Sequence, residues 1–79
     1  MSDNDVRERV VNVVARTLKI DRARIIDSAR FVDDLGAESI QSVELMAAFE
    51  EEFDIEMDDE KALGVKTVGK AVEFIQNMM

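Results

Sequence analysis

The sequence predicts an all-α fold: a small four-helix bundle with three main helices, one short helix, and a long loop between the first and second helices. Apolar residues recur at spacings of three and four in three stretches of the chain. The 79 residues include no proline and only three glycines, so little interrupts these patterns. A chain of this length is expected to form one domain, residues 1–79, with a small core.

The first helix is expected to begin after the candidate N-cap Ser2 and to end near Lys19, because a series of valines follows at helical spacing. No helical period is sustained from residue 20 to residue 38, and this stretch is predicted to be the long loop. Gly36 permits a turn with positive φ just before the second helix. Five apolar residues are expected to hold the loop to the core: Ile25, Ile26, Phe31, Val32 and Leu35.

The second helix, predicted for residues 39–53, has two apolar stripes when it is drawn at 100° per residue. The stripe assigned to the core contains Ser42, Leu45, Met46, Phe49 and Phe53. The other stripe contains Ile40, Val43 and Ala47, and it is flanked by Glu44, Glu50 and Glu51. Either this second stripe covers the long loop, or it is an exposed surface for partners that carry basic patches. Periodicity leaves both interpretations open.

A short helix and the last main helix complete the predicted bundle. Asp58 or Asp59 is expected to cap a short helix that ends at Leu63, where Gly64 stops it. Thr67 is the candidate N-cap of the last helix, and apolar residues at helical spacing continue to Met78.

Charge and composition restrict the function. Ten Lys and Arg against eighteen Asp and Glu give a formal net charge of −8, which disfavours nucleic acid and anionic lipid and favours basic partners. Without Cys or His, the chain lacks the usual nucleophiles and general bases, so it is not expected to be an enzyme. No signal peptide or membrane-spanning run is found, and the expected form is a cytoplasmic monomer.

Ser39 stands where the second helix is expected to begin. The simplest interpretation is an N-cap. Catalysis is not expected, because no His is present to activate the hydroxyl. The position also suits a passive acceptor of a phosphate-linked group, because the N-terminus of a helix favours an anion.

The run "DDLGAESIQSVELMAAFEEEFDIEMDDE" resembles the centre of an acyl carrier protein, whose signature is D-x-L-G-x-D-S-L followed by an acidic amphipathic helix. The likeness includes Asp33, Leu35, Gly36 and Ser39, and it continues through "KTVGKAVEFI". It implies that a phosphopantetheinyl transferase attaches 4'-phosphopantetheine from coenzyme A to Ser39, and that acyl groups are held as thioesters on the terminal thiol. It also implies partners that transfer or elongate acyl chains and carry basic docking patches.

The same resemblance implies two sets of site residues. The partner-binding set is Glu38, Ile40, Val43, Glu44, Ala47, Glu50 and Glu51. The set expected to line the acyl chain is Leu45, Met46, Phe49, Phe53, Met57, Ala62, Val65, Val68 and Ala71. Ordinary core packing would account for the second set equally well.

The tripeptide Glu38-Ser39-Ile40 departs from the commoner Asp-Ser-Leu, which favours a carrier of a specialised pathway, such as polyketide or lipid A assembly, over housekeeping fatty acid synthesis. An alternative is an unmodified acidic module that binds a basic partner through the second helix. A divalent-cation sensor is a further alternative, although "DIEMDDE" lacks the ligand order of an EF-hand.

Overall fold

The protein is helical, and the computed structural model describes residues 3–58, 60 and 64–78. Its helices are α1 (Asp3–Leu18), the 3₁₀ helix η1 (Arg22–Arg24), α2 (Ser39–Phe53) and α4 (Val68–Met78). The three main helices predicted from the sequence are therefore confirmed, and α2 has the predicted bounds. The Ser2 cap and most of the predicted short helix before Gly64 lie outside the described residues.

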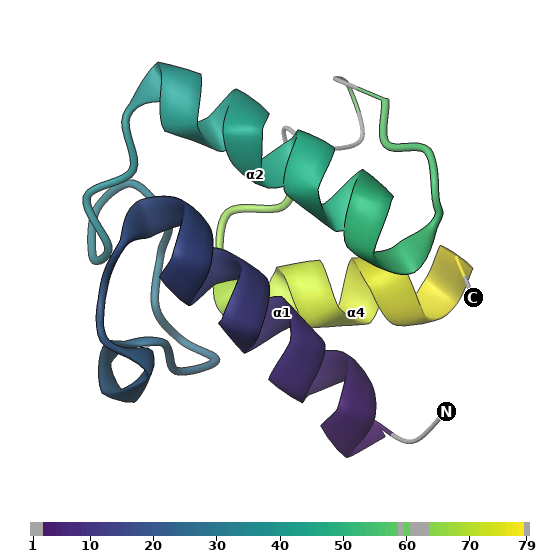
Figure 1. Ribbon diagram of the computed structural model, residues 1–79, viewed down its shortest axis with the longest axis horizontal. Helices are drawn as coiled ribbons and strands as arrows, with labels where there is room; N and C mark the ends of the chain where they lie inside the picture. The colour runs from purple at the N-terminus through teal and green to yellow at the C-terminus, as the bar shows by residue number, and fades with distance from the viewer. Residues whose placement is uncertain (1–2, 59, 61–63, 79) are drawn as a thin grey trace.

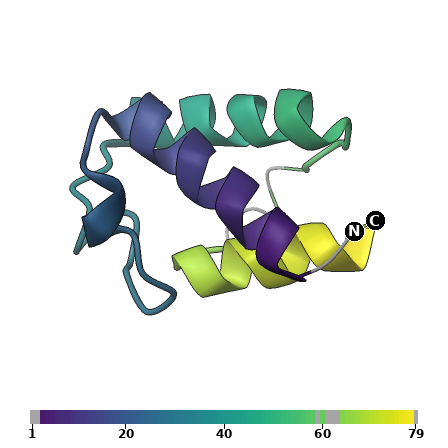
Figure 2. The same ribbon diagram turned by 60° about the horizontal axis from the view of Figure 1, so that its bottom comes forward.

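Helix α1 packs against both α2 and α4, and the core lies among the three helices (Figures 1 and 2). The start of α1 and the end of α4 lie at one end of the molecule, whereas α2 begins at the other end, beside the α1–α2 connection (Figure 1). The core is aliphatic with three phenylalanines: Val6, Val10, Val13, Val14, Leu18, Ile25, Ala29, Phe31, Leu35, Ala37, Leu45, Phe49, Phe53, Met57, Val68, Ala71, Val72 and Ile75 are buried.

The α1–α2 connection is hydrogen-bonded to the first turn of α4. The backbone N–H of Val68 donates to the carbonyl of Ala29 at 3.0 Å, and that of Gly69 donates to the carbonyl of Asp27 at 2.9 Å. These bonds satisfy N–H groups that the start of a helix otherwise leaves free. The approach is close: a Cβ on Gly69 would lie 3.1 Å from the carbonyl oxygen of Asp27.

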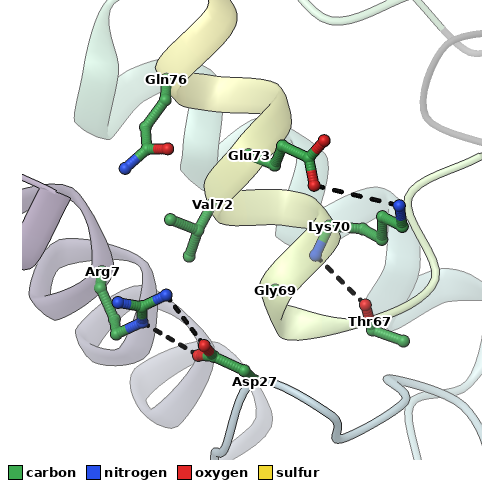
Figure 3. A pocket seen from close by; sticks show the side chains of 8 residues that line it. All are labelled: Arg7, Asp27, Thr67, Gly69, Lys70, Val72, Glu73 and Gln76. Carbon is green, nitrogen blue, oxygen red and sulfur yellow. Dashed lines mark hydrogen bonds and ion pairs between the residues drawn. The ribbon is translucent and has the colours of Figure 1, made fainter.

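Side chains reinforce the same junction (Figure 3). Arg7 of α1 donates from Nε and Nη2 to the carboxylate of Asp27, at 2.9 and 2.8 Å. The hydroxyl of Thr67 accepts the backbone N–H of Lys70 at 3.2 Å, which confirms the predicted cap of α4. The connection is thus fastened to both α1 and α4.

Only some of the apolar residues predicted to hold the connection do so. Ile25, Phe31 and Leu35 are buried, whereas Ile26 and Val32 are 57% and 62% exposed. The prediction was wrong for these two because an irregular segment has no fixed period that would tell inward from outward positions.

Arg9 links α1 to the end of α2. Its Nε donates to Oε2 of Glu52 at 2.8 Å, and its Nη2 donates to the backbone carbonyl of the same residue. The guanidinium also lies over the ring of Phe53, 4.4 Å from the centroid. One cation therefore bridges a side chain, a helix C-terminal carbonyl and an aromatic face.

Candidate functional site

A tight turn leads into α2 and sets where the helix begins. The backbone N–H of Leu35 donates to the carbonyl of Arg30 at 3.0 Å, and that of Ala37 donates to Phe31 at 2.8 Å. Leu35 and Ala37 are buried, and Gly36 between them has a φ of 72°. The predicted glycine turn is confirmed, and its buried neighbours hold it against the core.

Asp34 organises the same turn through its carboxylate. Its Oδ2 accepts the backbone N–H of Arg30 at 2.8 Å, and the Arg30 side chain lies 3.5 Å from it. The backbone hydrogen bond, together with the charge of Arg30, holds the pKa of Asp34 below its usual value, although partial desolvation opposes this shift. The Arg30 guanidinium also pairs with Asp33 at 3.2 Å.

Ser39 is the first residue of α2 and does not cap it. The N-cap is Glu38, whose backbone N–H donates to Oε1 of Gln41 at 2.9 Å. This bond is one half of a capping box, so the interpretation of Ser39 as the cap was wrong. Ser39 is exposed, and its hydroxyl forms no hydrogen bond with any residue that the structure describes.

The second apolar stripe of α2 is exposed. Ile40 and Val43 are 67% and 64% exposed, and Ala47 is exposed as well. The interpretation in which this stripe covers the loop was therefore wrong. Glu44 and Glu51 beside the stripe are also exposed, so apolar and acidic groups share one accessible helix face.

The remaining two residues of the predicted partner face differ from each other. Glu38 is exposed at the start of α2. Glu50 is half-buried, and its Oε2 accepts the backbone N–H of Met57 at 3.4 Å. This carboxylate helps to hold the chain after α2 as well as adding charge to the acidic face.

A largely apolar cavity of about 580 Å³ lies beside α2. The walls of this cavity include five of the residues that were predicted to contact an acyl chain: Leu45, Met46, Phe49, Met57 and Val65. Phe53, Val68 and Ala71, which were also predicted to line an acyl chain, are buried core residues and do not line this cavity. Ala62 lies outside the described residues.

Several lining residues were not predicted from the sequence: Arg30, Phe31, Val32, Asp33, Ser42, Val43 and Lys66. Most belong to irregular segments that tertiary contacts bring together, as when the backbone N–H of Phe31 donates to the carbonyl of Lys66 at 3.0 Å. Ser42 and Val43 could have been found, because they lie three and four residues after Ser39, about one helical turn away.

Two other features bear on function. Within the ranges described, no group of three His, Cys, Asp or Glu side chains is arranged to hold a metal ion. Among the same residues, no helix combines the length and apolar character needed to cross a bilayer.

Comparison with known proteins identifies a family. The chain matches the family described as "Phosphopantetheine attachment site" over residues 8–75. It is 50% identical over 76 residues to the acyl carrier protein of Phenylobacterium zucineum (strain HLK1), covering 96% of each chain. It is 47% identical over 73 residues to that of Buchnera aphidicola subsp. Acyrthosiphon pisum (strain 5A), covering 92% of this chain and 91% of the relative. For that of Caulobacter vibrioides (strain NA1000 / CB15N), identity is 50% over 72 residues, 91% of this chain and 92% of the relative.

The residues present fit the prosthetic group that this family carries. An exposed serine hydroxyl without a hydrogen-bond partner among the described residues stands at the positive end of a helix, where a phosphate is favoured. The chain contains no cysteine, so a thiol for acyl transfer has to come from the attached group. The chain therefore belongs to the acyl carrier proteins, which carry acyl groups on phosphopantetheine and are not themselves catalysts.

Proposed function

We propose that this protein carries acyl intermediates as thioesters on a 4'-phosphopantetheine arm esterified to Ser39, in fatty acid, polyketide or related lipid biosynthesis. The assignment to Ser39 rests on the observation that other residues cap the start of α2. Glu38 and Gln41 provide the cap, so the Ser39 hydroxyl is left exposed and available.

In the attachment reaction this chain supplies the acceptor hydroxyl and the favourable electrostatic field at the start of α2. The Ser39 oxygen forms the new bond to phosphorus, and the nucleotide part of coenzyme A leaves. Because this chain has no histidine, the transferase supplies the general base. The free N–H groups and dipole at the start of α2 favour the resulting phosphodiester anion by about 0.3 to 1 kcal/mol at an exposed site.

The cavity beside α2 is suited to the acyl chain. Ser42 and Val43 line it one turn from Ser39, and its volume of about 580 Å³ is in the range of small-molecule sites. Each methylene removed from water there contributes roughly 0.8 kcal/mol. Met46 and Met57 in its walls have flexible, polarizable side chains that adapt to a guest.

The exposed face of α2 is proposed to bind the transferase and the enzymes that load or elongate the chain. The proposed face comprises Glu38 before the helix, the exposed Ile40, Val43, Glu44, Ala47 and Glu51, and the half-buried Glu50. The acids attract basic patches and the aliphatic side chains supply contact area, so the partner should offer a basic rim around an apolar centre. The proposal also includes a single carrier domain over residues 1–79, a short helix before Gly64, and a cytoplasmic monomer.

Intact mass spectrometry tests the attachment. The protein is incubated with coenzyme A and a broad-specificity phosphopantetheinyl transferase, and its mass should rise by one phosphopantetheine. Ser39→Ala should abolish the gain. Ser42→Ala is the matched control, because its hydroxyl is already committed to the carbonyl of Glu38 at 3.3 Å. An unchanged wild-type mass with several transferases, or loss of modification in a folded Ser42 variant, would contradict the assignment.

A further inference from the structure

Lys66 lies at the wall of the apolar cavity and has no ion-pair partner among the residues that the structure describes. Among the described residues, three charged ones line that cavity: Arg30, Asp33 and Lys66. Arg30 and Asp33 pair with each other at 3.2 Å, so their charges largely cancel. Lys66 is exposed and forms no ion pair with any residue in the described ranges. Within the described residues, the cavity wall therefore carries one positive charge that has no ion-pair partner.

The backbone fixes the position of this lysine. The carbonyl of Lys66 accepts the N–H of Phe31 at 3.0 Å, and the following residue, Thr67, forms an isolated antiparallel bridge with Arg30. Val65, the preceding residue, lines the same cavity. The ammonium is thus carried by a segment whose backbone is bonded to the α1–α2 connection, and this segment is separate from α2, where the arm is proposed to attach.

We propose that Lys66 makes the carrier favour acyl chains that bear a carboxylate away from the thioester. This inference rests on the proposed function. An apolar cavity accepts the methylene groups of any chain, but it penalises a charged end group that loses its water. An ammonium at the wall offsets that penalty with a charge-assisted hydrogen bond, and a simple saturated chain gains nothing from it.

The test compares two acyl groups of equal length, octanoyl and the dicarboxylic suberyl group. Each is loaded on wild type, Lys66→Gln, Lys66→Arg and Lys70→Gln, and loading is confirmed by intact mass. Lys70 is the matched control, because it is an exposed lysine of α4 that pairs with Glu73 at 3.9 Å and does not line this cavity. The measurement is the rate at which hydroxylamine cleaves the thioester, releasing the hydroxamate and the free thiol.

Lys66→Gln should accelerate cleavage of the suberyl thioester about two- to fivefold, the effect of losing one partly exposed ion pair, and should leave octanoyl cleavage unchanged. Lys66→Arg should behave as wild type, as should Lys70→Gln. Equal effects of Lys66→Gln on the two thioesters, or no effect on either, would overturn the proposal.

The arm's own phosphate is another anion that Lys66 could bind, and it has a separate readout. If Lys66→Gln shifts the ³¹P resonance of the holo protein without any acyl group, and the suberyl and octanoyl rates respond alike, the lysine recognises the arm and the cargo proposal fails. Failure of the underlying function would be visible earlier, as absence of the mass gain that loading requires.

Discussion

At the residue scale, Asp34 connects the turn before Ser39 to the pH of the solution. Its carboxylate accepts the backbone N–H of Arg30, and this bond is the largest cause of its lowered pKa. Because the folded pKa lies below the unfolded value of roughly 3.9, the unfolded state binds more protons in the interval between them. The stabilisation is fully present above the unfolded pKa and is lost as the pH falls through the folded pKa.

Asp34→Asn should therefore flatten the acid side of the stability curve. The free energy of unfolding of wild type should fall more steeply below about pH 4 than that of the variant, whose amide cannot titrate. Urea denaturation at a series of pH values measures both slopes. Asp34→Ala is the companion variant, because it removes the acceptor too and should lose stability at neutral pH. Parallel acid slopes for wild type and Asp34→Asn would refute the argument.

Residue preference identified Ser39 from the sequence but gave it the wrong structural role. Serine is a favoured N-cap, and the pattern places it at the helix boundary, so capping is the natural expectation. The structure shifts the cap by one residue, because Gln41 lies within reach of the Glu38 backbone. One-residue shifts of this kind depend on side-chain conformation, which helical periodicity does not encode.

At the element scale, the α1–α2 contact depends on Arg9 as well as on apolar packing. The Arg9 and Glu52 side chains are 31% and 30% exposed, so solvent screens their ion pair less than a fully exposed one. The guanidinium also covers the ring of Phe53, a buried core residue. This contact lies at the end of α2 away from Ser39, so it should affect stability without affecting modification.

Arg9→Met tests that separation. Methionine keeps apolar contact with the ring but loses the charge-assisted hydrogen bonds, so we expect a destabilisation of about 1 to 2 kcal/mol, discounted for partial exposure. Arg9→Lys should recover only part of this loss, because an ammonium lacks the planar fork. Urea denaturation gives the stability, and intact mass after incubation with the transferase should show unchanged modification at Ser39. A loss of modification in the folded variant would contradict the separation of the two ends.

Some features of the helices could be predicted from local sequence, and others could not. The bounds of α2 and the Thr67 cap were predictable, because periodicity and capping are local properties. By propensity alone, Gly69 is only a weak helix former. In the structure its N–H donates to the carbonyl of Asp27, and a Cβ at this position would crowd the same carbonyl oxygen. Contacts between segments so distant in sequence are set by the tertiary fold, and the cavity walls at Arg30 and Lys66 were missed for the same reason.

At the scale of the whole molecule, the net charge of −8 is distributed unevenly. Among the described residues, five of the six ion pairs lie within or between α1, the connection and α4, and not on α2: Arg7–Asp27, Arg22–Glu8, Arg30–Asp33, Arg30–Asp34 and Lys70–Glu73. On α2, Glu44 and Glu51 form no ion pair with any residue in the part of the chain described. Uncompensated negative charge therefore gathers beside the exposed Ile40 and Val43, where it can steer a basic partner.

Charge reversal at Glu44 and Glu51 tests this steering. The double Glu→Lys variant should associate with a phosphopantetheinyl transferase more slowly than wild type, with the largest difference at low salt and a smaller one above about 0.1 M, where the Debye length falls to roughly 10 Å. Stopped-flow measurement of the association rate against ionic strength gives the comparison. The double variant Glu8→Lys with Glu73→Lys is the matched control. It changes the net charge by the same amount as the Glu44 and Glu51 variant, but on α1 and α4 instead of α2. If both double variants slow association to the same extent, net charge alone acts, and the face of α2 has no special part in recognition.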